Sequence, residues 1–110
     1  MKNFEYEDWL DDDGYPTEKA LEKITNWDYK DTLGCFEFIC SLWSYPNYYK
    51  SEKTTNDFDS PIVRIKLSTG GWSGNESIIN ALEKNHIIWM TSWFQSRRGG
   101  HYIFEVRVEK

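Results

Sequence analysis

The sequence contains little cysteine or histidine, the residues that form disulfides and bind zinc. Only two cysteines and two histidines occur among its 110 residues. Cys35 and Cys40 are five positions apart in a segment that we predict to be helical, so they lie on different faces and cannot bridge without distorting the backbone. A structural zinc site usually takes four Cys and His ligands in register. We therefore expect no metal site and no cofactor.

Long apolar stretches are also absent. No run approaches the roughly 18 apolar residues of a membrane-spanning helix, and the residues after Met1 lack the basic, apolar and small-residue order of a secretory leader. We therefore expect a cytoplasmic protein with no membrane role.

Charge is unevenly distributed along the chain. Residues 1–59 contain 14 acidic residues and six lysines, a net charge of −8, whereas residues 60–110 contain seven basic and four acidic residues, a net charge of +3. Six carboxylates fall within residues 1–13 among aromatic and apolar residues. This pattern predicts an acidic arm over residues 1–13, which either docks its rings on the domain or binds a partner, and a separate basic patch.

One domain over residues 1–110 is expected from the length. Aromatic residues make up 17% of the chain, so rings should fill much of its core. Thr17 is suited to cap a first helix over residues 17–26, in which apolar residues recur every three positions.

The next segment permits two interpretations. Asp31 can cap a helix that ends before Pro46, since apolar residues again recur at helical spacing. Gly34 and the β-prone aromatic residues leave a strand as the alternative over residues 31–44. Residues 46–60 show no periodicity and are predicted to form a loop of unusual length.

The second half of the chain begins with strand periodicity. Residues 61–68 alternate between apolar and polar side chains, which predicts a half-buried strand. Ser73 and Glu76 match a capping box at the start of the next helix, and Asn85 is suited to a left-handed stop.

The last two segments, residues 87–95 and 101–109, are predicted to pair as an antiparallel hairpin around Gly99 and Gly100, with the ring-rich first strand in the centre of the sheet. The core-facing residues of the last strand are expected to be Tyr102, Phe104, Val106 and Val108. The opposite face then carries His101, Glu105 and Arg107. The predicted fold class is α+β, two N-terminal helices followed by β-α-β-β with a small antiparallel sheet.

Two glycine-bearing loops are the best candidates for a site. The first, residues 70–75, joins a predicted strand to a predicted helix, where glycines let N–H groups converge and the helix dipole adds positive potential. It lacks the Lys of a P-loop and the final Gly of a nucleophile elbow. Its candidate ligand-binding residues are Gly70, Gly71, Trp72, Ser73, Gly74 and Asn75.

The second loop is the predicted hairpin tip, where two arginines precede two glycines. Arginine forks and bare backbone N–H groups suit phosphates or carboxylates, although a solvated turn is the alternative. Its candidate ligand-binding residues are Arg97, Arg98, Gly99, Gly100 and His101. No catalytic residue is assigned, because Ser73 is expected to serve as a cap and His101 as a general base has no recognisable substrate.

The polar face of the sheet is a third candidate, since Arg64, Lys66 and Arg107 should alternate onto it together with His101. Such a face can neutralise phosphates and stack bases where rings are exposed. Pairing with acids such as Glu105 is the simpler role for these cations.

The chain resembles small uncharacterised proteins of bacteriophage genomes in three segments, GYPT at 14–17, GGWSGNE at 70–76 and SRRGGHY at 96–102. The resemblance implies a context rather than an activity, because no functional residues come with it. Small acidic phage proteins bind and disarm host machinery, and some sequester signalling nucleotides.

Our leading hypothesis is a non-enzymatic protein in which the two glycine loops form one pocket for a nucleotide or another phosphate-bearing ligand, with a role in countering host defence. It requires the loops to be adjacent, which antiparallel pairing of strand 61–68 with the strand from His101 would achieve. The alternative is an inhibitor whose acidic arm, residues 1–13, covers a host nucleic-acid-binding enzyme. A small hydrolase around Ser73 and His101 is a third possibility.

Overall fold

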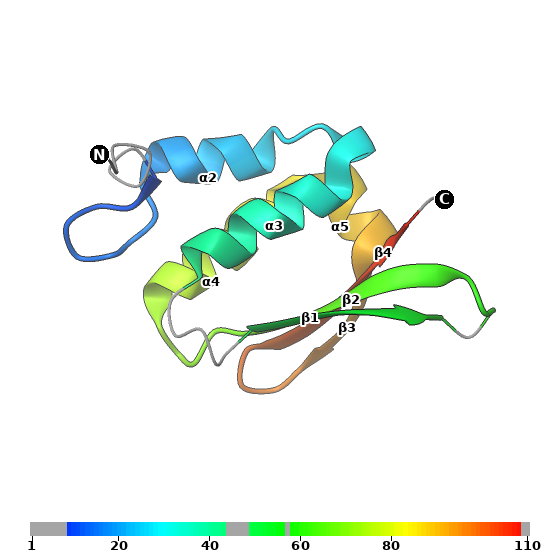
Figure 1. The fold of residues 1–110 in the computed structure, drawn as a ribbon. Helices are drawn as coiled ribbons and strands as arrows, with labels where there is room; N and C mark the ends of the chain where they lie inside the picture. Colours follow the sequence, from blue (N-terminus) through cyan, green and yellow to red (C-terminus); the bar gives the residue numbers. More distant parts are fainter. Residues whose placement is uncertain (1–8, 44–48, 57, 109–110) are drawn as a thin grey trace.

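A computed structural model describes residues 9–43, 49–56 and 58–108. In this part of the chain, helices form one layer and a four-stranded antiparallel sheet forms the other (Figure 1), which confirms the predicted α+β class. The helices are α2 (Glu18–Thr25), α3 (Thr32–Leu42), α4 (Ser73–Lys84) and α5 (His86–Ser92), with a 3-10 helix η1 (Tyr29–Asp31) before α3. The sheet has the order β1-β2-β4-β3, with β1 (Tyr49–Thr55), β2 (Pro61–Ser68), β3 (Trp93–Arg97) and β4 (His101–Arg107).

The two N-terminal helices lie where the sequence predicts them. The Thr17 hydroxyl caps α2 by accepting a hydrogen bond from the Ala20 N–H at 3.2 Å. Of the two structures that the sequence allowed over residues 31–44, a helix or a strand, the helix is confirmed, as α3. Asp31 precedes α3 without capping it, because its Oδ2 instead accepts a hydrogen bond from Trp27 Nε1 at 3.2 Å.

Strand β1 corrects the prediction of a loop over residues 46–60. It pairs with β2 along its whole length, with Ser51 opposite Ile65. Because β1 is an outer strand and its sequence, YKSEKTT, is polar on both faces, it lacks the apolar alternation that reveals a strand. Residues 44–48 and 57, also in or beside the predicted loop, lie outside the described part of the chain.

Helix α4 occupies its predicted place but starts differently. Ser73 is its first residue, and Trp72 is its N-cap without a side-chain capping bond. The Ser73 hydroxyl donates to Tyr15 Oη at 3.4 Å instead. The predicted capping box is therefore wrong, because the extended Trp72 already occupies the entrance of the helix.

A helix, α5, occupies most of the segment that we predicted to be a central strand. Asn85 has φ −87° rather than a left-handed conformation, and its Oδ1 accepts from the Ile88 N–H at 3.4 Å. Its Nδ2 donates to the carbonyl oxygens of Ile24 and Trp27, both at 3.0 Å. The residue expected to stop one helix thus also starts the next and ties both to α2.

The predicted hairpin between β3 and β4 is confirmed, and Gly99 and Gly100 at its tip have φ values of 85° and 81°. Strand β3 is nevertheless an outer strand, so the expectation of a central position is wrong. Strand β4 lies inside the sheet and pairs on its other side with β2, with Ser68 opposite His101.

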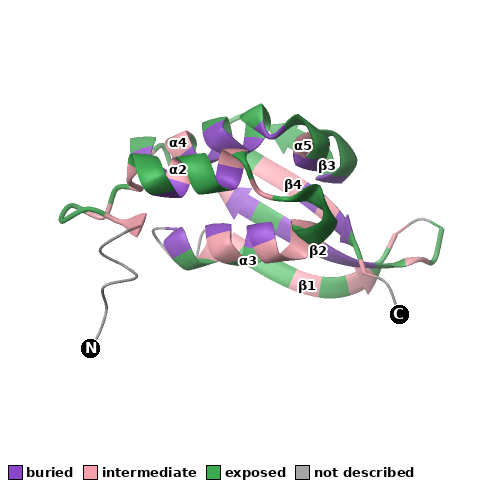
Figure 2. Cartoon of the chain, turned by 90° about the horizontal axis from the view of Figure 1, so that it is seen from above, coloured by how far each residue is buried: buried purple, intermediate pink, exposed green. Residues whose placement is uncertain are grey.

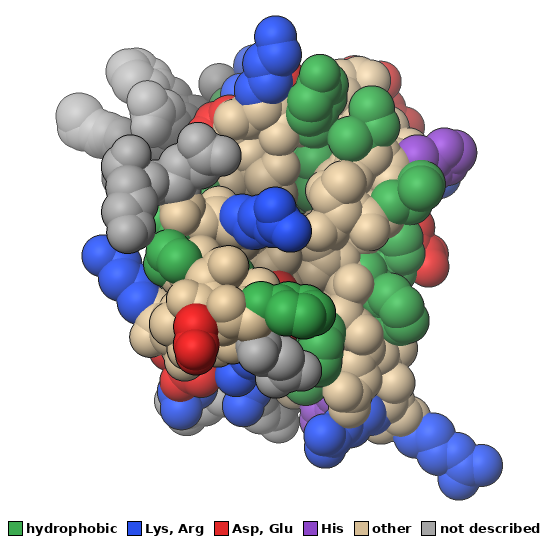
Figure 3. Space-filling view, turned by 90° about the vertical axis from the view of Figure 1, so that its right-hand side faces the viewer, with side chains coloured by type: hydrophobic (Ala, Val, Ile, Leu, Met, Phe, Trp, Pro, Cys, Tyr) green, Lys and Arg blue, Asp and Glu red, His purple; other side chains and the backbone are tan. Residues whose placement is uncertain are grey.

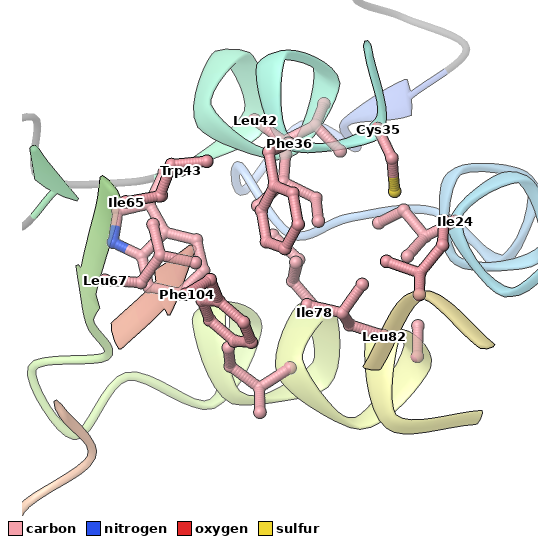
Figure 4. Packing of buried hydrophobic residues seen from close by; sticks show 14 of the residues in the cluster. Ile24, Cys35, Phe36, Leu42, Trp43, Ile65, Leu67, Ile78, Leu82 and Phe104 are labelled. Atoms are coloured by element: carbon pink, nitrogen blue, oxygen red, sulfur yellow. The ribbon is translucent and has the colours of Figure 1, made fainter. Parts of the chain in front are cut away.

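The core lies between the helices and one face of the sheet (Figure 2). Phe36 of α3 and Phe104 of β4 meet there at a ring-centroid distance of 4.9 Å (Figure 4). The predicted alternation of β4 is confirmed, because Phe104 and Val106 are buried whereas His101 and Arg107 are exposed. Within the described residues, every helix falls short of the length and apolarity needed to cross a bilayer.

Candidate anion-binding site

The face of the sheet turned away from the helices, here called the open face, carries an excess of positive charge. The helices α2, α3, α4 and α5 lie on the other side of the sheet (Figure 1). The strand register places on the open face the charged residues Lys50, Glu52, Arg64, Lys66, Arg97, Glu105 and Arg107. Five of these seven are cations, although the whole chain has a net charge of −5.

Two ion pairs compensate part of this charge. Arg64 Nη2 lies 2.8 Å from Glu105 Oε2, and the Arg64 Nε donates to the same oxygen at 3.3 Å. Lys50 Nζ and Glu52 Oε1 are 3.6 Å apart.

Three cations of the open face are not compensated in this way. Among the described residues, no carboxylate lies within ion-pair distance of Lys66, Arg97 or Arg107. These side chains are therefore available to an anion from outside the chain.

The two glycine loops are adjacent, as the leading hypothesis requires. The Thr69 N–H donates to the Gly100 carbonyl oxygen at 3.0 Å, and Ser68 Oγ lies 2.7 Å from His101 Nδ1. A Cβ on Gly100 would lie only 2.2 Å from Thr69 Oγ1, so a glycine is what allows the hairpin tip to approach the end of β2.

The first glycine loop directs its polar groups inward. Gly70 and Gly71 turn the chain with φ values of 65° and 76°. The Gly71 N–H then donates to Thr69 Oγ1 at 3.3 Å, and the Trp72 N–H to the Thr69 carbonyl oxygen at 3.1 Å. Asn75 is 0% exposed, and its Nδ2 reaches the same carbonyl oxygen at 3.4 Å.

Aromatic rings cover the start of α4. A Cβ on Gly74 would lie 2.1 Å from the Trp72 ring, so this ring lies directly against the first turn. Tyr15 packs on the outside of Trp72 with a centroid distance of 4.7 Å. The Trp72 ring and the buried Asn75 side chain thus help to fix the loop and the start of the helix.

The second glycine loop borders a hollow on the open face. Its volume is about 300 Å³, and it is lined by Lys66, Leu67, Ser68, Arg97, His101, Tyr102 and Ile103. Arg98 is exposed beside it, and Gly99 and Gly100 form the turn. The structure therefore brings Arg97 and His101 of the predicted site together with Lys66 of the predicted sheet face.

Gln95 orients Arg97. With its amide turned so that both groups are satisfied, the Gln95 side-chain oxygen accepts from Arg97 Nε at 2.7 Å and from Nη2 at 3.1 Å. Sequence reasoning missed this residue, although its position two residues before Arg97 on a strand places both on one face.

One titratable side chain bordering the hollow has a perturbed pKa. Burial, followed by the carboxylates of Glu83 and Glu76, raises the pKa of Tyr102 above its ordinary value. A raised pKa leaves this phenol uncharged at physiological pH, as it would be at its ordinary value.

The described residues do not form a catalytic arrangement around Ser73 and His101. Ser73 and His101 have different hydrogen-bond partners, Tyr15 and Ser68 respectively. Among the described residues, no carboxylate is hydrogen-bonded to His101 to orient it as a base. No group of three or more potential metal ligands occurs in the same part of the chain.

The two cysteines are free thiols of low reactivity. Burial, with a smaller contribution from Asp31, raises the pKa of Cys35 to about 12. Burial, with a smaller contribution from Glu37, raises the pKa of Cys40 to about 11. Neither side chain is a thiolate nucleophile near neutral pH.

The acidic arm is only partly described, because residues 1–8 lie outside the described part of the chain. Asp11 Oδ1 accepts hydrogen bonds from the N–H groups of Asp13 and Tyr15, both at 2.9 Å. This carboxylate stabilises a turn, and the hypothesis of an inhibitory arm stays a prediction.

Comparison with protein-family models, with curated proteins and with solved structures finds no match for this chain. The fold and the charge pattern define its class, a two-layer α+β protein whose sheet is covered by helices on one face and carries on the other face cations without an ion-pair partner in the described part of the chain.

Proposed function

We propose that this protein is a non-enzymatic binding protein whose ligand carries phosphate or a similar anion, bound in the hollow between Lys66, Arg97 and His101. The observation that carries the proposal is the excess of cations on an uncovered sheet face of an acidic chain. Charges of one sign gathered in one region attract a ligand of the opposite sign more strongly than their number alone suggests.

Each side chain of the hollow has a separate part in binding. The Arg97 guanidinium is held in place by Gln95, so less side-chain entropy is lost when its planar fork meets two oxygens of an anion. Lys66 supplies a compact charge from the neighbouring inner strand. His101, paired with Ser68 at 2.7 Å, adds a polar edge at the base of the hairpin.

A nucleotide is the ligand we favour among phosphate-bearing compounds. The resemblance to phage proteins supplies a setting for it, the cytoplasm of a host cell, where binding of a nucleotide signal would counter host defence. The exposed Arg98 and the backbone of Gly99 and Gly100 then contact the phosphate from the hairpin side.

Thermal unfolding with and without ligand tests the proposal. The panel is inorganic phosphate, pyrophosphate, nucleoside triphosphates, cyclic nucleotides and short oligonucleotides. A ligand at about one hundred times its Kd should add roughly 2.7 kcal/mol to the free energy of unfolding of the wild type. Lys66→Gln/Arg97→Gln should lose that increment.

The matched control is Lys53→Gln/Lys84→Gln, which removes the same charge from exposed positions off the open face. It should keep the increment of the wild type. Equal stabilisation of all three proteins, or no stabilisation by any phosphate compound, contradicts the proposal.

A further inference from the structure

The open face has a second hollow at the opposite end of β4. Its volume is about 190 Å³, and Ile62, Phe94, Glu105 and Arg107 are among the residues that line it. Ile62, Glu105 and Arg107 belong to the open face by strand register, whereas Thr91 and Ser92 come from the end of α5, so this hollow lies where the open face meets the start of β3. Phe94 is 50% exposed.

The two hollows are too far apart for one small anion. Lys66, Arg97 and His101 line the first hollow and Arg107 the second. His101 and Arg107 are six positions apart on β4, which corresponds to about 20 Å at roughly 3.4 Å per residue. A ligand that occupies both hollows must be elongated, with negative charge along its length.

Two exposed aromatic side chains, Trp93 and Phe94, line the second hollow. Exposed aromatic rings next to cations stack the bases of single-stranded nucleic acid while the cations neutralise its phosphates. Phe94 and Arg107 line the same hollow and provide one group of each kind. Figure 3 shows hydrophobic side chains exposed along one flank of the molecule and Lys and Arg side chains at its lower edge, with others at its top and centre.

We propose that the open face binds single-stranded nucleic acid, with a stretch of about three nucleotides crossing the sheet between the two hollows. Lys66, Arg97 and Arg107 neutralise its phosphates, and Phe94 stacks on one base. This inference rests on the proposed function, since it names the class of ligand taken by the same cations. A duplex is disfavoured because its bases are already stacked on one another.

Fluorescence anisotropy with labelled single-stranded DNA and RNA of three, six and twelve nucleotides tests the inference. Affinity should rise at least tenfold from a mononucleotide, measured by competition, to the six-nucleotide strand. Three cations on the phosphates predict that log K falls with log salt concentration with a slope of about −2. A duplex of equal length should bind more weakly.

Phe94→Ala should weaken binding of the six-nucleotide strand about tenfold, since stacking on one base contributes that much or more. Phe94→Leu keeps an apolar side chain but removes the ring, and its affinity should fall by the same tenfold. Agreement between the two variants shows that the loss does not come from a folding defect in the alanine variant. Met90→Ala is the control, because Met90 is 77% exposed on α5 and lines neither hollow. It should bind as the wild type does.

Three results would overturn the inference and leave the proposed function intact. They are equal affinity for mononucleotide and oligonucleotide, equal affinity for inorganic polyphosphate with no effect of the Phe94 variants, and tighter binding of the double strand than of the single strand. Binding of poly-glutamate as tight as that of the oligonucleotide would instead indicate a protein partner and also overturn it. Failure of every phosphate compound to bind would remove the proposed function as well.

Discussion

The two faces of the sheet are built from the same strands and have opposite properties. On β2, Ile65 and Leu67 face the helices and are each 1% exposed, while Arg64 and Lys66 between them face away. The helical face holds the core, whereas the open face holds two hollows and the unpaired cations Lys66, Arg97 and Arg107 among the described residues. The apolar residues that form the core therefore lie mainly on one face of the sheet, and most charged side chains of the strands lie on the other.

The comparison is tested most strongly by adjacent residues on opposite faces. Phe104 is 0% exposed and packs on Phe36 and Trp89 at centroid distances of 4.9 and 5.5 Å. Phe104→Ala should lower the free energy of unfolding by about 3 to 5 kcal/mol, through lost transfer energy and the cavity left behind. Urea denaturation followed by tryptophan fluorescence measures this change.

Ile103→Ala is the matched control, because Ile103 precedes Phe104 on β4 and points to the open face, where it is only half-buried. It should cost clearly less than Phe104→Ala. Equal losses for the two variants would mean that the open face carries as much of the stability as the core does.

The parts of the fold with regular apolar periodicity could be predicted from the sequence. Helix α2 and strands β2 and β4 have such periodicity and lie where expected. Strand β1 could not be found, because an outer strand with polar residues on both sides has no core-facing pattern. Helix α5 is only seven residues long and contains β-prone Ile87, Ile88 and Trp89, so its sequence favours a strand. Its formation depends on the side chain of Asn85, which caps it.

The candidate site could be predicted in part for the same reason. Antiparallel pairing of β2 with β4 is the arrangement that the leading hypothesis requires, and this pairing brings Thr69 next to Gly100. The conformation of the first glycine loop could not be predicted, because it depends on where the Trp72 ring packs. The Trp72 ring packs on Gly74 and on Tyr15, and it thereby covers the start of α4. Trp72 and Tyr15 are 57 positions apart in the sequence.

The contact between the two glycine loops, at the end of the sheet, can be tested at Gly100 in the hairpin tip. Gly100→Ala should cost about 3 kcal/mol, because a φ of 81° strains any other residue by about 1 to 2 kcal/mol and the new Cβ displaces Thr69 Oγ1. That displacement also breaks the 3.3 Å hydrogen bond from Gly71, worth about 1 kcal/mol. Chemical denaturation measures the cost.

Gly99→Ala is the matched control for this position. Its φ of 85° is equally unfavourable for alanine, but the nearest atom to a new Cβ is His101 Nε2 at 3.4 Å, an ordinary contact. It should therefore cost only the backbone strain, about 1 to 2 kcal/mol. If the two glycine variants were equally stable, the close approach of the two loops would have no energetic importance.

The smallest expected effect concerns the charges of the open face themselves. A double-mutant cycle with Arg64→Ala and Glu105→Ala should give a coupling energy of about 0.5 to 1 kcal/mol that decreases with added salt, since both side chains retain contact with water at 28% and 17% exposure. The more exposed pair Lys50 and Glu52, with atoms 3.6 Å apart, should give less than about 0.5 kcal/mol. A coupling energy above about 2 kcal/mol for the first pair would show that these charges are there to hold the sheet together. A small value means that stability does not account for the charge on this face, so that binding is the better reason for it.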